Sequence, residues 1–242
     1  MIYSQTIDTP SYLCDTEDKL HVWAAVRLCQ EVTEYHGNST GIGFKTLLEQ
    51  NRAWVISRAL YNFYRRPDAF EKIMLSTWAR GNDGLFAFRD YRISSAEGET
   101  LLTGTSYWPL IDMKSRRAIR LGDVIDGYDI ENMEATEHSK LGKIALPQMS
   151  DSDIVMRRTA VHSMLDHTLH VNNSEYIRLI FDCINDKGFD IDRPFALELN
   201  YNHETKHGEE LSVSLKQNND AVYVQIHNPR GLSVSAKITH IY

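Results

Sequence analysis

The sequence predicts an α+β fold of two similar halves, each with one long helix packed on an antiparallel sheet. In both halves, an amphipathic helix pattern is followed by four runs rich in β-branched and aromatic residues, separated by turn-forming residues. A stretch of low periodicity lies between the halves. Because several consecutive strands follow one helix, we expect the helix to cover one face of their sheet.

The first half, residues 1–122, begins with a short strand-like run at 2–6. Gly37 is placed to end the helix that follows. The helical pattern rests on apolar residues at Val22, Ala25, Val26, Cys29 and Val32. The later strand-like runs span residues 53–64, 73–80, 85–93 and 101–113.

The second half, residues 154–242, repeats this order of elements. It opens with a strand-like run at 154–162 and a helix at about 173–187, which Gly188 is expected to end. Further strand-like runs span 195–202, 210–215, 222–227 and 232–241. A short string also recurs, since Leu20-His21-Val22 and Leu169-His170-Val171 each precede a helix. The matching order of elements is the better evidence for an internal repeat.

Residues 123–153 are predicted to be an acidic linker between the halves. This stretch contains eight acidic residues and two lysines, and so carries −6 of the chain's formal net charge of −7. A protein that binds nucleic acid over its surface is usually basic, so we do not expect nucleic-acid binding. An acidic partner could still bind a local basic patch elsewhere in the chain.

Apolar runs and cysteines indicate where the protein resides. No apolar run approaches the roughly 20 residues that a membrane-spanning helix needs, and the N-terminus lacks the basic and apolar segments of a secretory signal. The cysteines Cys14, Cys29 and Cys183 are an odd and sparse set, which is typical of a reducing compartment. We therefore expect a cytoplasmic protein.

One segment of the second half resembles the signature of a known family. Residues 163–176 read Ser-Met-Leu-Asp-His-Thr-Leu-His-Val-Asn-Asn-Ser-Glu-Tyr, which is similar to the motif D-x-N-x-H-V-N-N-x-x-Y of the acyl-ACP thioesterases. Parts of the first half resemble the same family in the same order, at residues 41–49, 53–58, 77–78, 86–91 and 106–112. The chain is accordingly identified as a bacterial relative of the plant fatty acyl-ACP thioesterases.

This resemblance implies a tandem, or double, hot-dog fold, in which each half is a long helix wrapped by an antiparallel sheet. It implies hydrolysis of the thioester of fatty acyl-[acyl carrier protein], with the acyl chain bound by the first half and catalysis in the second. The partner would be acyl carrier protein bearing a phosphopantetheine-linked acyl chain, and we expect no metal or other cofactor. The catalytic residues that the resemblance carries over are Asp166, Thr168, His170 and Glu204.

These side chains suit the hydrolysis of a thioester. Asp166 could hold His170 in one tautomer or bind the attacking water itself. The N–H groups at the start of the following helix could stabilise the oxyanion. Glu204 is the best candidate for the general base, although either acid could take this role.

Two positions depart from the family pattern. Thr168 stands where the family usually has asparagine, and its hydroxyl donates one hydrogen bond in place of the amide. Thr205 stands where many plant relatives have cysteine. A cysteine nucleophile at this position is therefore excluded.

A second motif competes for Glu204. The segment His203–His207 matches the zinc-protease pattern H-E-x-x-H, which requires a helix to bring its two histidines onto one face. Apolar residues alternate over 197–201, which predicts a strand leading into this segment. Because residues four apart in a strand lie roughly 13 Å apart, we expect no zinc site here.

A run of basic residues lies near the end of the first half. It comprises Lys114, Arg116, Arg117 and Arg120, and such a run can be a solvated turn. Arg116 and Arg117 are nevertheless candidates for binding acyl carrier protein, because that carrier is acidic and complementary charge raises the association rate.

Chain-length preference and some alternative functions stay open at this level. The resemblance implies an acyl tunnel in the first half, with Trp23 and Trp54 as candidates for its wall, although each could equally pack in the core. Each buried methylene contributes about 0.8 kcal/mol, so tunnel depth can set the preferred chain length. The alternatives are an acyl-CoA thioesterase, a non-catalytic acyl-binding module and a zinc peptidase. Paired halves are compatible with a monomer, but the oligomeric state is left open.

Overall fold

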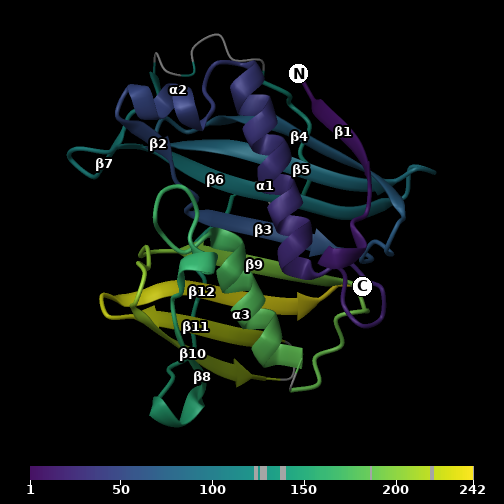
Figure 1. Ribbon diagram of the computed structural model, residues 1–242, viewed down its shortest axis with the longest axis vertical. Helices are drawn as coiled ribbons and strands as arrows, with labels where there is room; N and C mark the ends of the chain where they lie inside the picture. The colour runs from purple at the N-terminus through teal and green to yellow at the C-terminus, as the bar shows by residue number, and fades with distance from the viewer. Residues whose placement is uncertain (123–124, 126–129, 137–139, 186, 219–220, 242) are drawn as a thin grey trace. The chain divides into compact units, whose positions relative to one another are not determined.

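The computed structural model describes residues 1–122, 125, 130–136, 140–185, 187–218 and 221–241. These residues form two compact units, Met1–Leu141 and Gly142–Tyr242. Within each unit, the described neighbouring strands pair antiparallel, and a helix covers one face of the sheet (Figure 1). The predicted α+β organisation is therefore confirmed.

The sheet of the first unit is built around the long strand β6 (Thr100–Asp112). Two short strands, β2 (Arg52–Trp54) and β7 (Arg117–Ile119), pair with the last residues of β6. Across the sheet the main strands run β1 (Tyr3–Asp8), β4 (Lys72–Asn82), β5 (Phe86–Ser95), β6 and β3 (Arg58–Phe63).

Helix α1 (Val22–Ser39) lies across this sheet and buries its predicted apolar face (Figure 1). The helix continues past Gly37, so the predicted stop at that residue is wrong. A Cβ at Gly37 would lie 3.3 Å from the Cα of Gly43, which indicates that this glycine serves close packing against the following turn. The left-handed backbone that follows the helix is found at Gly41, whose φ is +79°.

The region after α1 differs from the strand-like run predicted at 53–64. It contains a short helix, α2 (Phe44–Glu49), followed by β2 and β3 as separate strands. Trp54 packs against a buried cluster of Leu47, Leu110 and Leu121. This packing places Trp54 in a core of the first unit.

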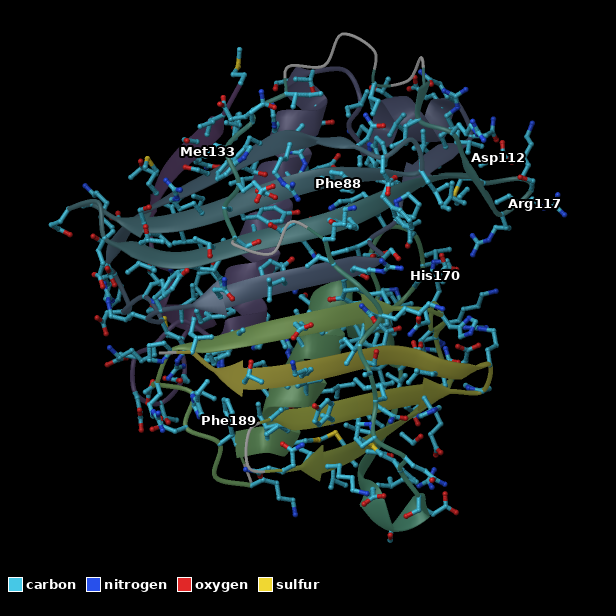
Figure 2. All side chains as sticks on the ribbon, turned by 180° about the vertical axis from the view of Figure 1, so that it is seen from behind. Phe88, Asp112, Arg117, Met133, His170 and Phe189 are labelled. Carbon is cyan, nitrogen blue, oxygen red and sulfur yellow. The ribbon has the colours of Figure 1, made fainter. Side chains whose placement is uncertain are left out.

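Part of the predicted acidic linker lies on the first unit as a strap, defined as residues 130–136. Met133 lies over the sheet face opposite α1, as Figure 2 shows from behind, and its carbonyl accepts a hydrogen bond of 2.7 Å from the Trp78 indole. The Ala135 N–H donates to the Asp90 carboxylate at 2.8 Å. The strap therefore supplies polar partners to side chains that the sheet buries.

The linker residues from 142 to 153 belong to the second unit. The Ile144 N–H donates to the Asn200 side chain at 2.9 Å, and the Gln225 amide donates to the Pro147 carbonyl at 3.1 Å. Residues 123–124, 126–129 and 137–139 of the predicted linker lie outside the described residues.

The second unit repeats the arrangement of helix and sheet. Helix α3 (Asn173–Asn185) buries Tyr176, Ile177, Ile180 and Ile184, as the sequence predicts. Gly188 follows in the left-handed conformation with a φ of +75°, which is consistent with its predicted role at the helix end. The strands run in the order β9 (Phe195–Tyr201), β12 (Gly231–His240), β11 (Val222–Asn228), β10 (Glu210–Gln217) and β8 (Ile154–Thr159).

Neither α1 nor any other helix in the described part of the chain combines the length and apolar content that crossing a lipid bilayer requires.

A buried histidine in the first unit makes its stability depend on pH. The Arg89 guanidinium lies 3.0 Å from His36 Nδ1, and arginine only donates, so the neutral imidazole accepts there. Burial, with the Arg89 charge and the N-terminal amino group, lowers the pKa of His36 to about 4. The unfolded chain has a pKa of about 6.5 at this residue, so it binds the proton first as the pH falls.

The stability that His36 contributes is therefore present above about pH 6.5 and is lost as the pH falls toward 4. We expect the free energy of unfolding to fall between pH 7 and pH 5 by up to about 2 kcal/mol more in the wild type than in His36→Gln, which keeps an acceptor for Arg89. Urea unfolding at both pH values measures this difference. Equal losses in the two proteins would contradict a neutral buried His36.

Candidate active site

A tight loop before α3 holds three of the predicted catalytic residues. The Asp166 N–H donates to the His170 carbonyl at 2.9 Å, and the Leu169 N–H donates to the Asp166 carbonyl at 3.0 Å. Leu169 adopts a left-handed backbone with a φ of +64°, which costs a non-glycine residue roughly 1–2 kcal/mol. The surrounding hydrogen bonds hold this turn, so that Asp166, Thr168 and His170 lie within one loop.

Thr168 links Asp166 to His170. The Thr168 hydroxyl donates to Asp166 Oδ1 at 2.5 Å, and the Thr168 N–H donates to the same oxygen at 2.8 Å. The hydroxyl oxygen also lies 3.2 Å from His170 Nδ1. Because the single hydroxyl proton is directed to Asp166, the oxygen accepts from Nδ1–H, which fixes the orientation of the imidazole.

Glu204 meets the other nitrogen of the same imidazole. Its Oε2 lies 3.3 Å from His170 Nε2. The Glu204 side chain is 35% exposed and the His170 side chain is 15% exposed. The loops that carry them are joined by the backbone, since the Val171 N–H donates to the Thr205 carbonyl at 2.8 Å. The structure thus brings all four predicted side chains into one chain of contacts within the second unit, from Asp166 through Thr168 and His170 to Glu204.

The start of α3 offers fewer free donors than the sequence suggested. The Asn172 side chain caps the helix by accepting from the Ser174 N–H at 2.9 Å, and the Glu175 N–H donates to the Asn172 carbonyl at 2.9 Å. Two amides of the first turn are therefore already engaged. The N–H of Asn173, the first residue of the helix, is the donor that such a cap leaves for a ligand.

The segment with the zinc-protease pattern is not helical. Residues 202–209 form a loop between β9 and β10, so the condition that would stack His203 and His207 on one helix face is not met. The Thr205 side chain in this loop is fully buried. Its hydroxyl accepts from the Asn228 amide at 3.0 Å and lies 3.3 Å from the Ser233 hydroxyl, so it supports the loop from within.

Arg116 and Arg117, the predicted carrier-binding residues, lie in the first unit on the hairpin between β6 and β7. Both side chains are exposed. Arg117 faces Asp112 across the hairpin, as Figure 2 shows, and Arg116 occupies the left-handed turn with a φ of +58°. Their position is that of an exposed tip of the first unit.

Sequence reasoning missed the residues that hold the loop of Glu204. These are Glu209, Asn228, Arg230 and Ser233, which contact the main chain of residues 203–206. The Asn-Pro-Arg-Gly string at 228–231 signals a turn. Nothing in that local signal connects the turn to Glu204, because the contact spans more than twenty residues.

Comparison with known proteins shows the family to which the chain belongs. The family model described as "Acyl-ACP thioesterase N-terminal domain" matches residues 1–128. The model described as "Acyl-ACP thioesterase C-terminal domain" matches residues 148–239. The chain therefore belongs to the acyl-ACP thioesterase family, as the resemblance in its sequence predicted.

Curated relatives are plant proteins of low identity. A chloroplastic dodecanoyl-[acyl-carrier-protein] hydrolase from Umbellularia californica is 27% identical over 84% of this chain and 56% of its own length. A chloroplastic oleoyl-acyl carrier protein thioesterase from Arabidopsis thaliana is 23% identical over 98% of this chain and 69% of its own length. The chain thus spans between about half and two thirds of the length of these relatives.

Solved structures match the chain along almost all of its length. An acyl-ACP thioesterase from Bacteroides thetaiotaomicron has a TM-score of 0.81 at 22% identity, covering 99% of this chain and 98% of its own. A 12:0-ACP thioesterase from Umbellularia californica has a TM-score of 0.84 at 20% identity, covering 98% and 96%. At this identity the likeness establishes the fold alone, and it confirms the predicted tandem hot-dog fold.

Proposed function

We propose that the protein hydrolyses the thioester of fatty acyl-[acyl carrier protein] and releases free fatty acid. The observation that carries this proposal is the chain of contacts from Asp166 through Thr168 and His170 to Glu204, found in a member of the acyl-ACP thioesterase family. The imidazole of His170 contacts the Glu204 carboxylate directly and the Asp166 carboxylate through Thr168. These groups can supply the proton transfers that thioester hydrolysis requires.

Glu204 is the general base in this proposal. Asp166 Oδ1 already accepts two hydrogen bonds from Thr168, whereas Glu204 is about one third exposed and within reach of water. A carboxylate only accepts, so its contact with His170 Nε2 is a hydrogen bond when one proton lies between them. Asp166, acting through Thr168, stabilises the positive charge that the imidazole acquires when it holds that proton.

The reaction follows from these positions. Glu204 takes a proton from water as the water oxygen bonds to the thioester carbon, and the oxyanion that forms is stabilised by the N–H of Asn173 at the positive end of α3. The carbon–sulfur bond then breaks. The proton held between Glu204 and His170 passes to the sulfur, which leaves a fatty acid and the thiol of the carrier's phosphopantetheine.

Acyl carrier protein docks on the hairpin of Arg116 and Arg117 in this account. The hairpin presents positive charge on a chain whose net charge is −7, and an acidic carrier would be steered to it. The assignment of the acyl chain to the first unit stays a prediction. We also propose a cytoplasmic location, since the three cysteines Cys14, Cys29 and Cys183 are an odd and sparse set.

Assaying acyl-ACP and acyl-CoA side by side tests the proposed carrier. We expect the double variant Arg116→Asn/Arg117→Ala to lower kcat/KM for acyl-ACP by about 5–10-fold at low salt, and we expect the difference to fade at high salt. Asparagine is chosen at position 116 because it tolerates the left-handed backbone. Hydrolysis of acyl-CoA should change much less.

The matched control is Arg157→Ala/Arg158→Ala, which removes two exposed arginines from β8 in the second unit. It should leave kcat/KM for acyl-ACP within about twofold of the wild type, since surface charges that do not belong to the docking site steer weakly in salt. Equal losses in both double variants would contradict docking at the hairpin, and a preference for acyl-CoA in the wild type would replace the carrier protein with coenzyme A as the substrate.

A further inference from the structure

The loop that carries Glu204 is held by hydrogen bonds from an arginine that lies in a turn distant in sequence. Arg230, between β11 and β12, donates from Nη2 to the carbonyl oxygen of Glu204. The same guanidinium binds Glu209 at both oxygens, at 2.8 and 2.9 Å. Glu209 in turn accepts from the Lys206 N–H at 2.8 Å. Arg230 and Glu209, named here the second-unit clamp, therefore hold the main chain on both sides of Thr205.

The turn that supplies Arg230 is itself ordered by its neighbours. The Asn228 side chain accepts from the Arg230 N–H at 2.9 Å, and its amide donates to the Glu204 carbonyl at 2.9 Å. The Glu204 carbonyl thus receives two donors. This arrangement fixes the peptide from which the catalytic carboxylate projects.

The first unit contains a loop with the same hydrogen-bond pattern. The Leu20 N–H donates to the Pro67 carbonyl as the Val171 N–H donates to that of Thr205, each at 2.8 Å. Glu71 accepts from the Asp68 N–H at 2.8 Å, as Glu209 does from Lys206. These equivalences place Arg66 at the position of Glu204 and Glu71 at that of Glu209.

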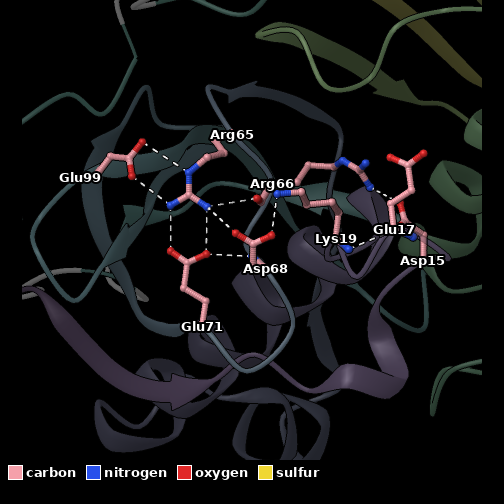
Figure 3. A network of polar contacts seen from close by, with 8 residues as sticks. All are labelled: Asp15, Glu17, Lys19, Arg65, Arg66, Asp68, Glu71 and Glu99. Carbon is pink, nitrogen blue, oxygen red and sulfur yellow. Dashed lines mark hydrogen bonds and ion pairs between the residues drawn. The ribbon is translucent and has the colours of Figure 1, made fainter.

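The same equivalences correct an impression from the sequence. The Asp15 N–H donates to the Lys19 carbonyl at 2.9 Å, as the Asp166 N–H donates to the His170 carbonyl. Lys19 therefore corresponds to His170, and His21 in the repeated Leu-His-Val string does not. In the first unit, Arg66 forms an ion pair with Asp15 (Figure 3). The positions equivalent to Glu204 and Asp166 are therefore joined there by an ion pair.

The first unit nevertheless keeps a clamp of the same chemistry. Arg65 binds Glu71 at both oxygens, at 2.8 and 2.9 Å, and donates to the Arg66 carbonyl at 3.4 Å (Figure 3). Arg65 lies in the loop itself, two residues after β3 ends at Phe63, whereas Arg230 comes from the turn after β11. Two arginines from unrelated elements thus make the same contacts to the same loop position, which indicates that this position needs them to keep its geometry.

We propose that Arg230, held by Glu209, is a positioning residue that fixes the main chain of Glu204 and thereby sets the contact of its carboxylate with His170. This inference rests on the proposed thioesterase function. The clamp is partly exposed, with Arg230 at 41% and Glu209 at 20%, so its contribution to global stability is small. Its effect is local, on the placement of the general base.

The test compares Arg230→Ala with Arg65→Ala, which opens the equivalent clamp around Arg66 in the first unit. We expect Arg230→Ala to lower kcat for acyl-ACP by about 10–100-fold with KM within about twofold, because misplacing a catalytic group by about 1 Å costs a factor of this size. Arg230→Lys keeps a donor without the planar fork and should recover part of the loss. Arg65→Ala should leave kcat within about twofold.

Amide hydrogen exchange on the full chain gives a readout that does not depend on turnover. Exchange over residues 202–209 should rise in Arg230→Ala and stay unchanged in Arg65→Ala, with thermal midpoints of both variants near the wild type. Unchanged exchange over that loop, or an unchanged kcat, in Arg230→Ala would overturn the positioning role. Absence of hydrolysis by the wild type would instead overturn the proposed function, while the exchange result would still decide whether Arg230 fixes the loop.

Discussion

His170→Ala and Glu204→Gln are each expected to lower kcat for acyl-ACP by at least about 10²-fold without unfolding the protein. The reason is the 3.3 Å contact between His170 Nε2 and Glu204 Oε2. Removing either group removes the pair that holds the proton between its departure from water and its arrival at the leaving sulfur. Asp166→Ala is expected to cause a loss of the same order, because it removes the acceptor that holds Thr168 and, through it, the imidazole.

Steady-state hydrolysis of one acyl-ACP, with circular dichroism on every variant, measures these effects. His207→Ala is the control, since it removes an exposed histidine from the loop that carries Glu204, which is also the second histidine of the H-E-x-x-H string. It should keep near-normal kcat. Near-normal activity in His170→Ala or Glu204→Gln would remove these residues from the mechanism, and a collapse in His207→Ala would point to the zinc-protease alternative.

Thr168→Val is expected to lower kcat by about 10–100-fold. Valine keeps the branched shape of threonine but removes the hydroxyl that donates to Asp166 at 2.5 Å and lies 3.2 Å from His170 Nδ1. The carboxylate and the imidazole would then lose their link, and a buried or half-buried polar group left without its partner costs about 1–3 kcal/mol. This corresponds to a factor of roughly 5–160 in rate if the link is needed in the transition state, and the expected loss lies within that range.

Two further substitutions at this position make the test specific. Thr168→Ser retains the hydroxyl and should stay within about threefold of the wild type. Thr168→Asn introduces the family residue, whose amide can donate to Asp166, and should retain more activity than Thr168→Val. The relay through Thr168 would be wrong if valine and serine gave the same kcat in a steady-state assay.

Much of the fold could be predicted because its signals are local. The long helix α1 and the strands of both units follow from apolar spacing that a short window of sequence contains. The six residues of α2 are too few to show a helical period. The continuation of α1 past Gly37 was missed because a glycine is needed at this position for close packing against Gly43, and this contact is not visible in the local sequence. The strap over the first sheet depends on Trp78 and Asp90, which are distant in sequence.

The residues of the candidate site also differ in whether their place in the site follows from local sequence. Asp166, Thr168 and His170 lie in one short loop, so their proximity could be expected from their spacing. Glu204 was reached only through the resemblance to a family, and Arg230 was missed, because both belong to the site through long-range pairing of strands and turns. The sequence placed His21 opposite His170, whereas backbone hydrogen bonds show that Lys19 is the equivalent residue. Three letters in common carry less information than the hydrogen bonds of the loop.

The measurement that tests the account most directly is the release of free fatty acid from acyl-ACPs of about eight to eighteen carbons, with a chelator present, by the wild type beside Glu204→Gln. The account predicts chelator-resistant release by the wild type, with a preferred chain length, that falls at least about 10²-fold in the variant. Tight binding of acyl-ACP without release by the wild type would contradict it and identify an acyl-binding module. Equal release by the two proteins would contradict the role of Glu204.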